Sequence, residues 1–234
     1  PTLNEEQNQM LEGQITFQEA LSALKNMSNN KSPGSDGFTT EFFKFFWIDI
    51  GYFLLRAINY GYETGEFSST QKEGIITCIP KGDKPKQFLK NWRPISLLNT
   101  AYKISSSCIA NRIKLVLPSI ISHDQTGFIA GRFIGENIRT LYDLMDYTEK
   151  HDIPGLLLLI DFEKAFDSVA WSFIHKVLIF FNFGESLKRW ISVAYKNAKS
   201  CVIVNGHVSA WLHLGRGCRQ GDPLSPYIFI LCAE

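Results

Sequence analysis

The stretch Gly155-Leu-Leu-Leu-Leu-Ile-Asp-Phe-Glu-Lys-Ala-Phe-Asp-Ser168 decides the fold that the sequence predicts. Leu156–Ile160 is an unbroken apolar run whose length favours a strand buried on both faces over a helix. Asp161 would then lie at the exposed end of a rigid strand, followed by the backbone carbonyl of Phe162. Mg²⁺ prefers oxygen ligands of this kind. We therefore predict Asp161 and the Phe162 carbonyl as metal ligands; the alternative is that Asp161 only ends the strand or caps a turn.

The composition is that of an ordinary globular protein. The chain has 234 residues, 45% hydrophobic and 20% charged, enough for one large domain or two small ones with a real core. The formal net charge of +1 excludes a strong overall basic field, so a nucleic-acid partner would need a local basic lining. Five widely spaced cysteines form no zinc or redox motif and fit a reducing intracellular compartment. We expect neither a membrane span nor a signal peptide.

The first half of the chain predicts helices and one hairpin. Thr16-Phe-Gln-Glu19 is a capping box in front of a helical run, and turn-forming residues between Asn29 and Gly37 interrupt that run. Two further helical patterns follow. Gly74–Ile79 is β-branched and predicts a strand, Lys81–Lys86 is a basic turn, and Phe88–Leu98 contains the returning strand.

The second half alternates between helices and short strands. Helical patterns are expected at about 101–117 (ending at Pro118), 137–150, 171–182 and 185–197. The pair Asn205-Gly206 between two β-rich runs predicts a hairpin turn. A last helix is predicted from Pro223. The sequence stops at Leu-Cys-Ala-Glu234, within this apolar, helix-like run, which is the pattern of a sequence cut inside a helix.

Six short motifs follow one another in a fixed order. They are Lys31-Ser-Pro-Gly-Ser-Asp-Gly-Phe38, Ile79-Pro-Lys81, Asn91-Trp-Arg-Pro-Ile-Ser-Leu-Leu98, Asp124-Gln-Thr-Gly-Phe128, Asp161-Phe-Glu-Lys-Ala-Phe-Asp167 and Arg219-Gln-Gly-Asp-Pro-Leu-Ser-Pro226. Each motif alone is weak, but six in this order are specific. Together they resemble the reverse transcriptases of non-LTR (LINE-type) retrotransposons, and the match covers nearly the whole chain.

The resemblance implies an α+β fold, the right-hand polymerase fold of reverse transcriptases in incomplete form. Residues 1–150 would be mostly helical fingers with a β-hairpin, and residues 151–234 the start of an antiparallel palm sheet with flanking helices. The activity implied is that of an RNA-directed DNA polymerase, which copies retrotransposon RNA into DNA by Mg²⁺-dependent nucleotidyl transfer in the cytoplasm and nucleus. The implied partners are an RNA template, a DNA primer or target, deoxynucleoside triphosphates and the rest of the polyprotein, with no membrane.

The resemblance also implies roles at the reaction centre. Asp161 matches the first metal-binding, catalytic aspartate of the palm, which shares two Mg²⁺ ions. Phe166 matches the aromatic residue that lies under the incoming sugar and excludes a 2′-hydroxyl. Asp167 matches the family pattern without being a metal ligand, and a helix cap or turn former suits it.

Further roles concern the nucleotide and the template. Lys81 and Arg93 match the finger residues that grip the triphosphate, which suits a guanidinium; without the resemblance, a solvated turn lysine and a surface ion pair are the simpler interpretations. Gln220 and Gly221, with the neighbouring Arg219, match the loop that touches template and nucleotide. Glycine in that loop permits close backbone approach.

One departure from the family pattern is large. The Tyr/Phe-Ala-Asp-Asp hairpin that completes the two-metal site does not occur before Glu234, and the thumb and endonuclease do not occur either. One aspartate does not sustain a mechanism in which two metals stabilise both the attacking and the leaving oxygen. We therefore expect this chain to be inactive by itself.

Three alternatives remain open at this stage. A phosphoryl hydrolase with Asp161 as nucleophile would want a second aspartate two residues on, where the chain has Glu163. A non-catalytic RNA-binding remnant of a retroelement would keep the fold without the reaction. A group II intron-type maturase shares the fold, although the motifs Lys31–Phe38 and Gln125–Phe128 favour the retrotransposon branch.

Overall fold

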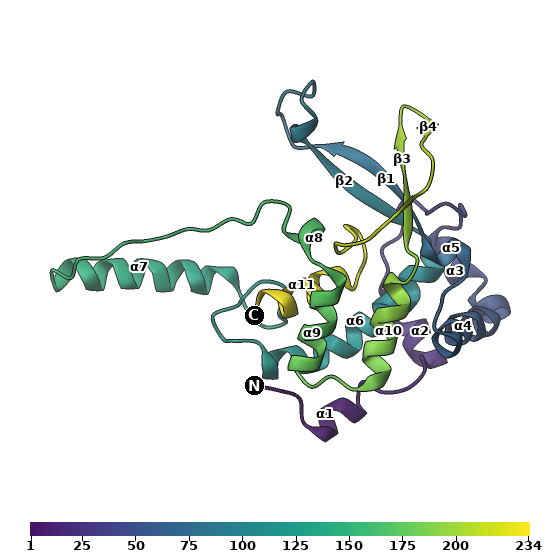
Figure 1. The fold of residues 1–234 in the computed structure, drawn as a ribbon, viewed down its shortest axis with the longest axis horizontal. Coiled ribbons are helices and arrows are strands. Elements are labelled where there is room, and N and C mark those ends of the chain that lie inside the picture. Colours follow the sequence, from purple (N-terminus) through teal and green to yellow (C-terminus); the bar gives the residue numbers. More distant parts are fainter.

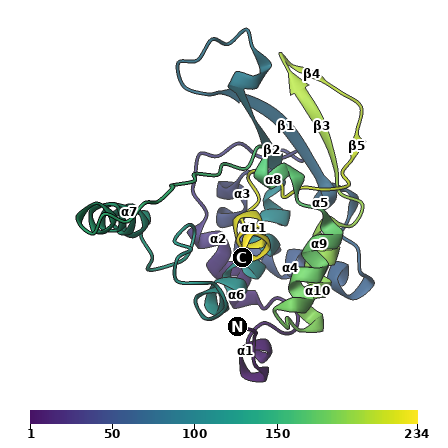
Figure 2. The same ribbon diagram turned by 60° about the vertical axis from the view of Figure 1, so that its left-hand side comes forward.

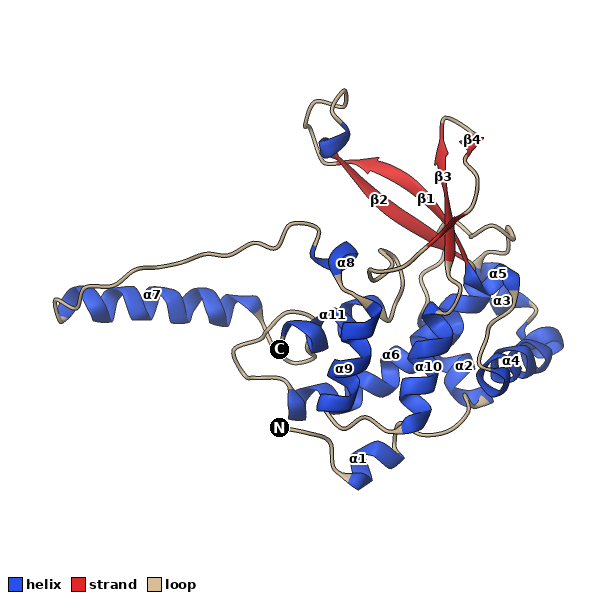
Figure 3. Ribbon diagram, in the orientation of Figure 1, coloured by secondary structure: helices blue, strands red, loops and turns tan.

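The computed structural model describes residues 1–234 and places a small β-sheet above a body of helices (Figure 1). Figure 3 shows the same separation, with the strands gathered at one end of the molecule and the helices packed below them. The fold is α+β, as the resemblance implies. No helix is long and apolar enough to cross a membrane.

Helices make up most of the regular structure. In chain order they are α1 Glu5–Gln9, α2 Phe17–Asn26, α3 Thr40–Phe45, α4 Trp47–Thr64, α5 Ser69–Lys72, the 3-10 helix η1 Leu89–Asn91, α6 Thr100–Ile120, α7 Ile134–Lys150, α8 Ala165–Ser168, α9 Trp171–Phe180, α10 Glu185–Tyr195 and α11 Ser225–Ala233. The capping box predicted for α2 is confirmed: the Thr16 side chain accepts from the Glu19 amide, and the Glu19 side chain accepts from the Thr16 amide.

The sheet is mixed. Its strands are β1 Glu73–Pro80, β2 Trp92–Leu98, β3 Lys199–Val204, β4 His207–Val208 and β5 Leu212–His213. The strand order is β2-β1-β3-β4, and β5 also pairs with β3. The β1–β2 pair is antiparallel, as expected for a hairpin, but β3 joins β1 in parallel. The sheet therefore crosses the boundary predicted at residue 150, because strands from both sides of that boundary pair within it.

The core lies around α6, which contacts α2, α5, α10 and α11. Buried residues lie on more than one face of α6, among them Tyr102, Ile104, Ile113 and Leu117. A helix covered in this way is stabilised mainly by packing rather than by helix propensity. The helices packed around α6 thus give the sheet and its loops a rigid base.

The prediction that α6 ends at Pro118 was wrong. The helix continues to Ile120 with Pro118 inside its last turn. Proline lacks the N–H that would donate to the carbonyl of Lys114, and both residues are exposed. Water can satisfy that carbonyl, while burial of Leu117 and Ile120 holds the last turn in place.

The prediction that Leu156–Ile160 forms a buried strand was also wrong. These residues form no helix or strand, and the exposed fractions of their side chains range from 52% at Leu157 to 93% at Leu156. No backbone hydrogen bond involves residues 154–163. A strand buried on both faces needs a paired strand on each side. Here β1 pairs with β2 on one side and with β3 on the other, and none of the strands pairs with the apolar run.

The run instead lies beside α7. Figures 1 and 2 show α7 projecting from the body, with the chain returning along it towards α8. A hollow between the two is lined by Leu141, Leu144 and Met145 of α7 and by Ile153–Leu157 of the returning segment. The helix predicted near 137–150 is confirmed as α7, which spans Ile134–Lys150. No residue of α7 is buried.

The remaining elements agree with the sequence pattern. The helices predicted near 171–182 and 185–197 correspond to α9 and α10, and the helix predicted from Pro223 corresponds to α11. Asn205 and Gly206 both have positive φ, 50° and 81°, and connect β3 to β4 in an antiparallel hairpin. Positive φ at both central residues is the geometry of a type I′ turn, which Asn-Gly favours.

Candidate functional site

The tip of the β1–β2 hairpin is strongly basic. Between residues 81 and 93 the chain has four lysines and one arginine against a single carboxylate, Asp83. Ile79 pairs with Arg93, and the Lys81 amide donates to the Asn91 carbonyl at 2.8 Å, which continues the same register by one more pair. Alternation along the strands then places Lys81 and Arg93 on one face. This is the local basic lining that the net charge did not reveal.

The two cations differ in their surroundings. The Lys81 Nζ donates to the Lys90 carbonyl at 2.9 Å, so it is partly held within the hairpin. Arg93 is exposed and has no hydrogen bond or ion pair from its side chain. Its guanidinium is therefore free to bind a phosphate through two N–H groups.

The loop that carries Gln220 and Gly221 is attached to the hairpin. The Ser96 amide of β2 donates to the Gln220 carbonyl at 2.8 Å. Gly221 has φ of 104°, and a Cβ built there would lie 2.8 Å from the Ser96 carbonyl oxygen. Only glycine accommodates both the dihedral angle and the close approach.

The same loop is attached to the segment around α8. The Cys218 amide donates to the Phe166 carbonyl at 2.7 Å, and the Gly217 amide donates to the Val169 carbonyl at 2.8 Å. The Gln220 side-chain amide lies 3.4 Å from a carboxylate oxygen of Asp167, within hydrogen-bond reach. Three segments distant in sequence therefore meet here: β2, the α8 turn and residues 217–221.

A cleft of about 280 Å³ opens where they meet. Its lining residues come from β1 (Ile76), β2 (Pro94, Ser96), the α8 turn (Asp167), β3 (Ser200) and residues 214–220. The lining includes Arg216, Arg219, Gln220 and Asp167, so both signs of charge and several hydrogen-bonding groups surround it. A polar cleft of this kind suits a polar ligand better than an apolar one.

Phe166 lies in α8 and packs on α11. Its ring stacks on that of Phe229 with a centroid separation of 4.5 Å and an interplanar angle of 23°. Phe166 is partly buried against the core cluster. The ring is thus held in one position by its neighbour, and part of it remains accessible.

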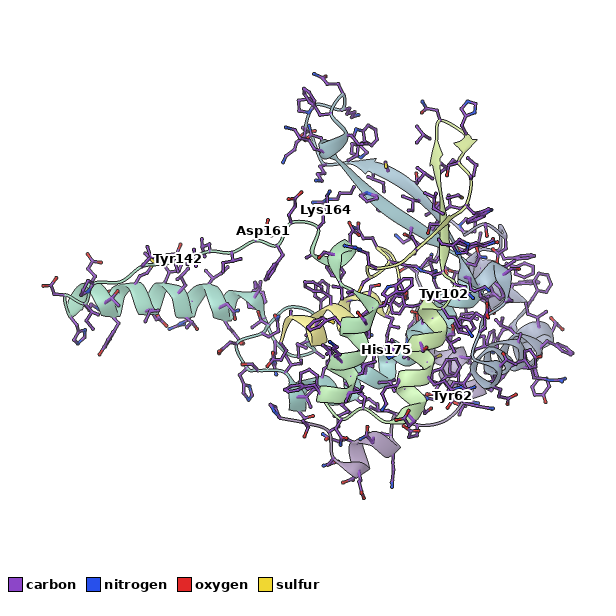
Figure 4. All side chains as sticks on the ribbon, viewed as in Figure 1. Tyr62, Tyr102, Tyr142, Asp161, Lys164 and His175 are labelled. Carbon is purple, nitrogen blue, oxygen red and sulfur yellow. The ribbon has the colours of Figure 1, made fainter.

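Asp161 and Phe162 are not joined to this assembly. Figure 4 shows Asp161 on the segment that returns from α7 towards α8. Both residues are exposed, and neither the Asp161 carboxylate nor the Phe162 carbonyl has a hydrogen-bond partner. The rigid strand end predicted for Asp161 is therefore absent.

The donor set for a metal can be judged from these two residues. A carboxylate and a carbonyl fit Mg²⁺ chemically, since this ion takes one or two carboxylates together with substrate phosphates. No group of three or more His, Cys, Asp and Glu side chains lies close enough to hold an ion. The two oxygens fit part of a metal site, and the other ligands would have to come from elsewhere.

Arg219 differs from its predicted role. The residue is only 4% exposed, and its guanidinium carbon lies 5.1 Å from the centroid of the Tyr102 ring. Little of this side chain is open to a template, although Arg219 borders the cleft. Arg219 instead holds the loop on which Gln220 and Gly221 lie.

The sequence analysis predicted no role for a group of polar residues that lies behind the loop. Asp222 is buried and accepts hydrogen bonds from the hydroxyl groups of Tyr102 and Ser106 in α6. Asp222 belongs to the motif Arg219–Pro226, but nothing local indicates that its carboxylate points inward. The contact joins residues more than a hundred positions apart, which no spacing rule detects.

The chain matches the family described as "Reverse transcriptase (RNA-dependent DNA polymerase)" over residues 79–234. It is similar to the "Transposon TX1 uncharacterized 149 kDa protein" of Xenopus laevis, with 37% identity over 100% of this chain and 18% of the relative. A "Retrovirus-related Pol polyprotein from type-1 retrotransposable element R2" of Nasonia vitripennis is 32% identical over 84% of this chain and 18% of the relative. A "Probable RNA-directed DNA polymerase from transposon X-element" of Drosophila melanogaster is 28% identical over 91% of this chain and 24% of the relative.

The chain thus spans only about a fifth of the length of these relatives. Within that part, the matched residues include the basic hairpin tip and the three segments that meet at the cleft, namely β2, the α8 turn and the loop at 217–221. The chain therefore belongs to the reverse transcriptase (RNA-dependent DNA polymerase) family, in the branch found in non-LTR retrotransposons.

Proposed function

We propose that this chain is the fingers and the first part of the palm of an RNA-directed DNA polymerase that copies retrotransposon RNA into DNA. The observation that carries the proposal is the meeting of β2, the α8 turn and the loop at 217–221 around one polar cleft, next to a hairpin with five cations at its tip. A nucleotide bound there would have basic groups for its phosphates and a partly exposed ring, Phe166, for its sugar.

Each side chain has a part in binding and orientation. Arg93 and Lys81 neutralise the triphosphate, which positions its α-phosphate for attack by a primer 3′-hydroxyl. Gln220 and the Gly221 backbone contact the template and the nucleotide, held by the bond to Ser96. Phe166 lies under the sugar and rejects a 2′-hydroxyl.

Asp161 and the Phe162 carbonyl would hold Mg²⁺ in this scheme. Two such ions, when bound, stabilise the charge on the attacking and leaving oxygens of the displacement. Because this chain supplies one carboxylate and one carbonyl, we propose that the remaining ligands come from other parts of a longer polyprotein. That polyprotein would act in the cytoplasm and nucleus, where an RNA template and a DNA primer or target are both present.

The same argument explains the exposed segment Leu156–Ile160. Five consecutive apolar side chains exposed to water are unfavourable. In the longer protein we propose that these residues form the buried strand predicted from the sequence. Asp161 would then gain the rigid placement that it lacks here.

Primer extension tests the proposal. The 234-residue chain and a polypeptide of the relatives' full length would each be given an RNA template, a DNA primer, deoxynucleotides and Mg²⁺. We expect extension by the long polypeptide and none by the short chain above a mock preparation. A long polypeptide that binds RNA but never extends would favour the RNA-binding remnant, and a preference for its own intron RNA would favour the maturase.

A further inference from the structure

A buried carboxylate lies directly behind the loop Gln220–Gly221. Asp222 is 3% exposed. Its Oδ2 accepts a hydrogen bond of 2.7 Å from the Tyr102 hydroxyl, and its Oδ1 accepts from the Ser106 hydroxyl and, at 3.0 Å, from the Leu224 amide. An ionised carboxylate is costly to bury unless it is hydrogen-bonded and electrostatically compensated. The two hydroxyl donors therefore fix Asp222 against α6, and the Leu224 amide fixes its carboxylate within the loop.

A buried cation lies on the face of the Tyr102 ring. The guanidinium carbon of Arg219 is 5.1 Å from the ring centroid, and its Nη2 donates to the Ala194 carbonyl at 3.4 Å. Burial raises the pKa of Tyr102 well above its usual range, the charge of Asp222 raises it further, and the charge of Arg219 opposes the shift. Tyr102 is thus a neutral donor placed between a buried cation and a buried anion.

The two buried charges lie on either side of Gln220 and Gly221 in the chain. Arg219 precedes Gln220, and Asp222 follows Gly221. With both neighbours fixed in the interior and the Gln220 carbonyl bonded to Ser96, the backbone of these two residues has little freedom. Gln220 lines the cleft, and the backbone of Gly221 lies against the Ser96 carbonyl of the hairpin.

We infer that Tyr102, Ser106 and Asp222 are positioning residues that hold Gln220 and Gly221 in the geometry for binding nucleotide and template. None of the three touches the cleft. The inference about what the loop binds rests on the function proposed above. The inference that the loop is anchored through Asp222 stands on the contacts alone.

Adjacent serines of α6 provide a matched pair for the test. Ser105 and Ser106 are 1% and 4% exposed. The Ser106 hydroxyl donates to Asp222, whereas the Ser105 hydroxyl donates at 2.8 Å to the carbonyl of Tyr102 within its own helix. Ser106→Ala and Ser105→Ala therefore remove the same group from the same helix, but only Ser106→Ala removes a contact with the loop.

Amide hydrogen exchange on the 234-residue chain measures the anchor. A hydrogen bond to a charged group corresponds to about 10–100-fold in an opening equilibrium. The Asp222 and Leu224 amides are hydrogen-bonded in the loop. We expect their exchange, relative to that of the α2 amides, to rise by that factor in Ser106→Ala and Tyr102→Phe and to stay within about twofold of wild type in Ser105→Ala. Unchanged exchange in both Ser106→Ala and Tyr102→Phe would overturn the inference that the loop is anchored through Asp222. An equal rise in Ser105→Ala would overturn it as well. If Tyr102→Phe does not fold, the two serine variants decide.

Steady-state kinetics of the full-length polymerase measure the positioning. We expect Tyr102→Phe to raise the KM for deoxynucleotide about tenfold and to leave kcat within about twofold. Because Tyr102 acts through Gln220, the double variant with Gln220→Ala should be no worse than Gln220→Ala alone. Additive effects, or a loss confined to kcat, would reject the positioning role. A wild-type polypeptide that never extends a primer would reject the proposed function, while the exchange result would still decide the anchor.

Discussion

The backbone amide of Ser96 in β2 donates a 2.8 Å hydrogen bond to the carbonyl of Gln220, and thereby joins the basic hairpin to the loop beside α8. Gly221 follows, with a dihedral angle and a clearance that admit no side chain. The contact couples the position of the hairpin to that of the loop. If a ligand contacts both the hairpin and the loop, a displacement of either segment would change how that ligand is bound.

Gly221→Ala tests this contact by stability. An L-residue at φ of 104° is strained, and the new methyl group would meet the Ser96 carbonyl oxygen. We expect the free energy of unfolding to fall by about 1–3 kcal/mol. The control is Gly215→Ala in the same stretch, where a Cβ meets nothing within 4 Å and φ is not positive. Chemical denaturation would show a loss in Gly221→Ala only; equal midpoints would contradict the prediction.

Asp161→Asn separates the metal role of Asp161 from a structural one. The carboxylate is exposed and has no partner, so we expect the free energy of unfolding to change by no more than about 0.5 kcal/mol. In the full-length polymerase the extension rate should fall by about a thousand-fold or more, since metal-assisted charge stabilisation contributes several kcal/mol. Asp152→Asn, at an exposed position before the same segment, should retain the rate. Near-wild-type extension by Asp161→Asn would make Asp161 structural.

Arg93→Ala and Lys81→Ala test the basic hairpin tip in the full-length polymerase. Each should raise the KM for deoxynucleotide about tenfold or more and alter RNA affinity less, because a charged hydrogen bond to phosphate contributes about 1.5–3 kcal/mol. The control is Lys84→Ala, an exposed lysine of the same tip with no side-chain contact. Loss of RNA binding with unchanged KM would place Lys81 and Arg93 in the template channel instead.

Phe166→Ala tests sugar selection in the full-length polymerase. A ring under C2′ would clash with a ribose hydroxyl and desolvate it, which gives a discrimination of roughly a thousand-fold. We expect Phe166→Ala to lower the ratio of kcat/KM for a deoxynucleotide over its ribonucleotide by orders of magnitude.

The stacked partner of Phe166 provides the control for that experiment. Phe229→Ala removes the other ring of the stack but leaves Phe166 in α8. If Phe166 were only a core residue, its loss would cost about 3–5 kcal/mol of stability and depress both nucleotides equally. An unchanged ratio in a destabilised Phe166→Ala variant, matched by the same result in Phe229→Ala, would end the sugar-selection hypothesis.

Features that depend on a few neighbouring residues could be predicted from the sequence. The capping box at Thr16, the turn at Asn205-Gly206 and the β1–β2 hairpin all have the predicted form, because local hydrogen bonds and turn geometry specify them. The six ordered motifs likewise led to the family, and three of them supply residues that line the cleft: Pro94, Ser96, Asp167, Arg219 and Gln220.

Features that depend on distant partners were decided only by the tertiary structure. The apolar run Leu156–Ile160 has the composition of a buried strand, but burial needs paired strands on both sides, and the 234 residues provide none. Arg219 was predicted to contact the template because its motif matches the loop that touches template and nucleotide in the family. It is buried because its guanidinium packs on the Tyr102 ring and donates to the Ala194 carbonyl, and these contacts exist only once α6, α10 and the loop have packed together.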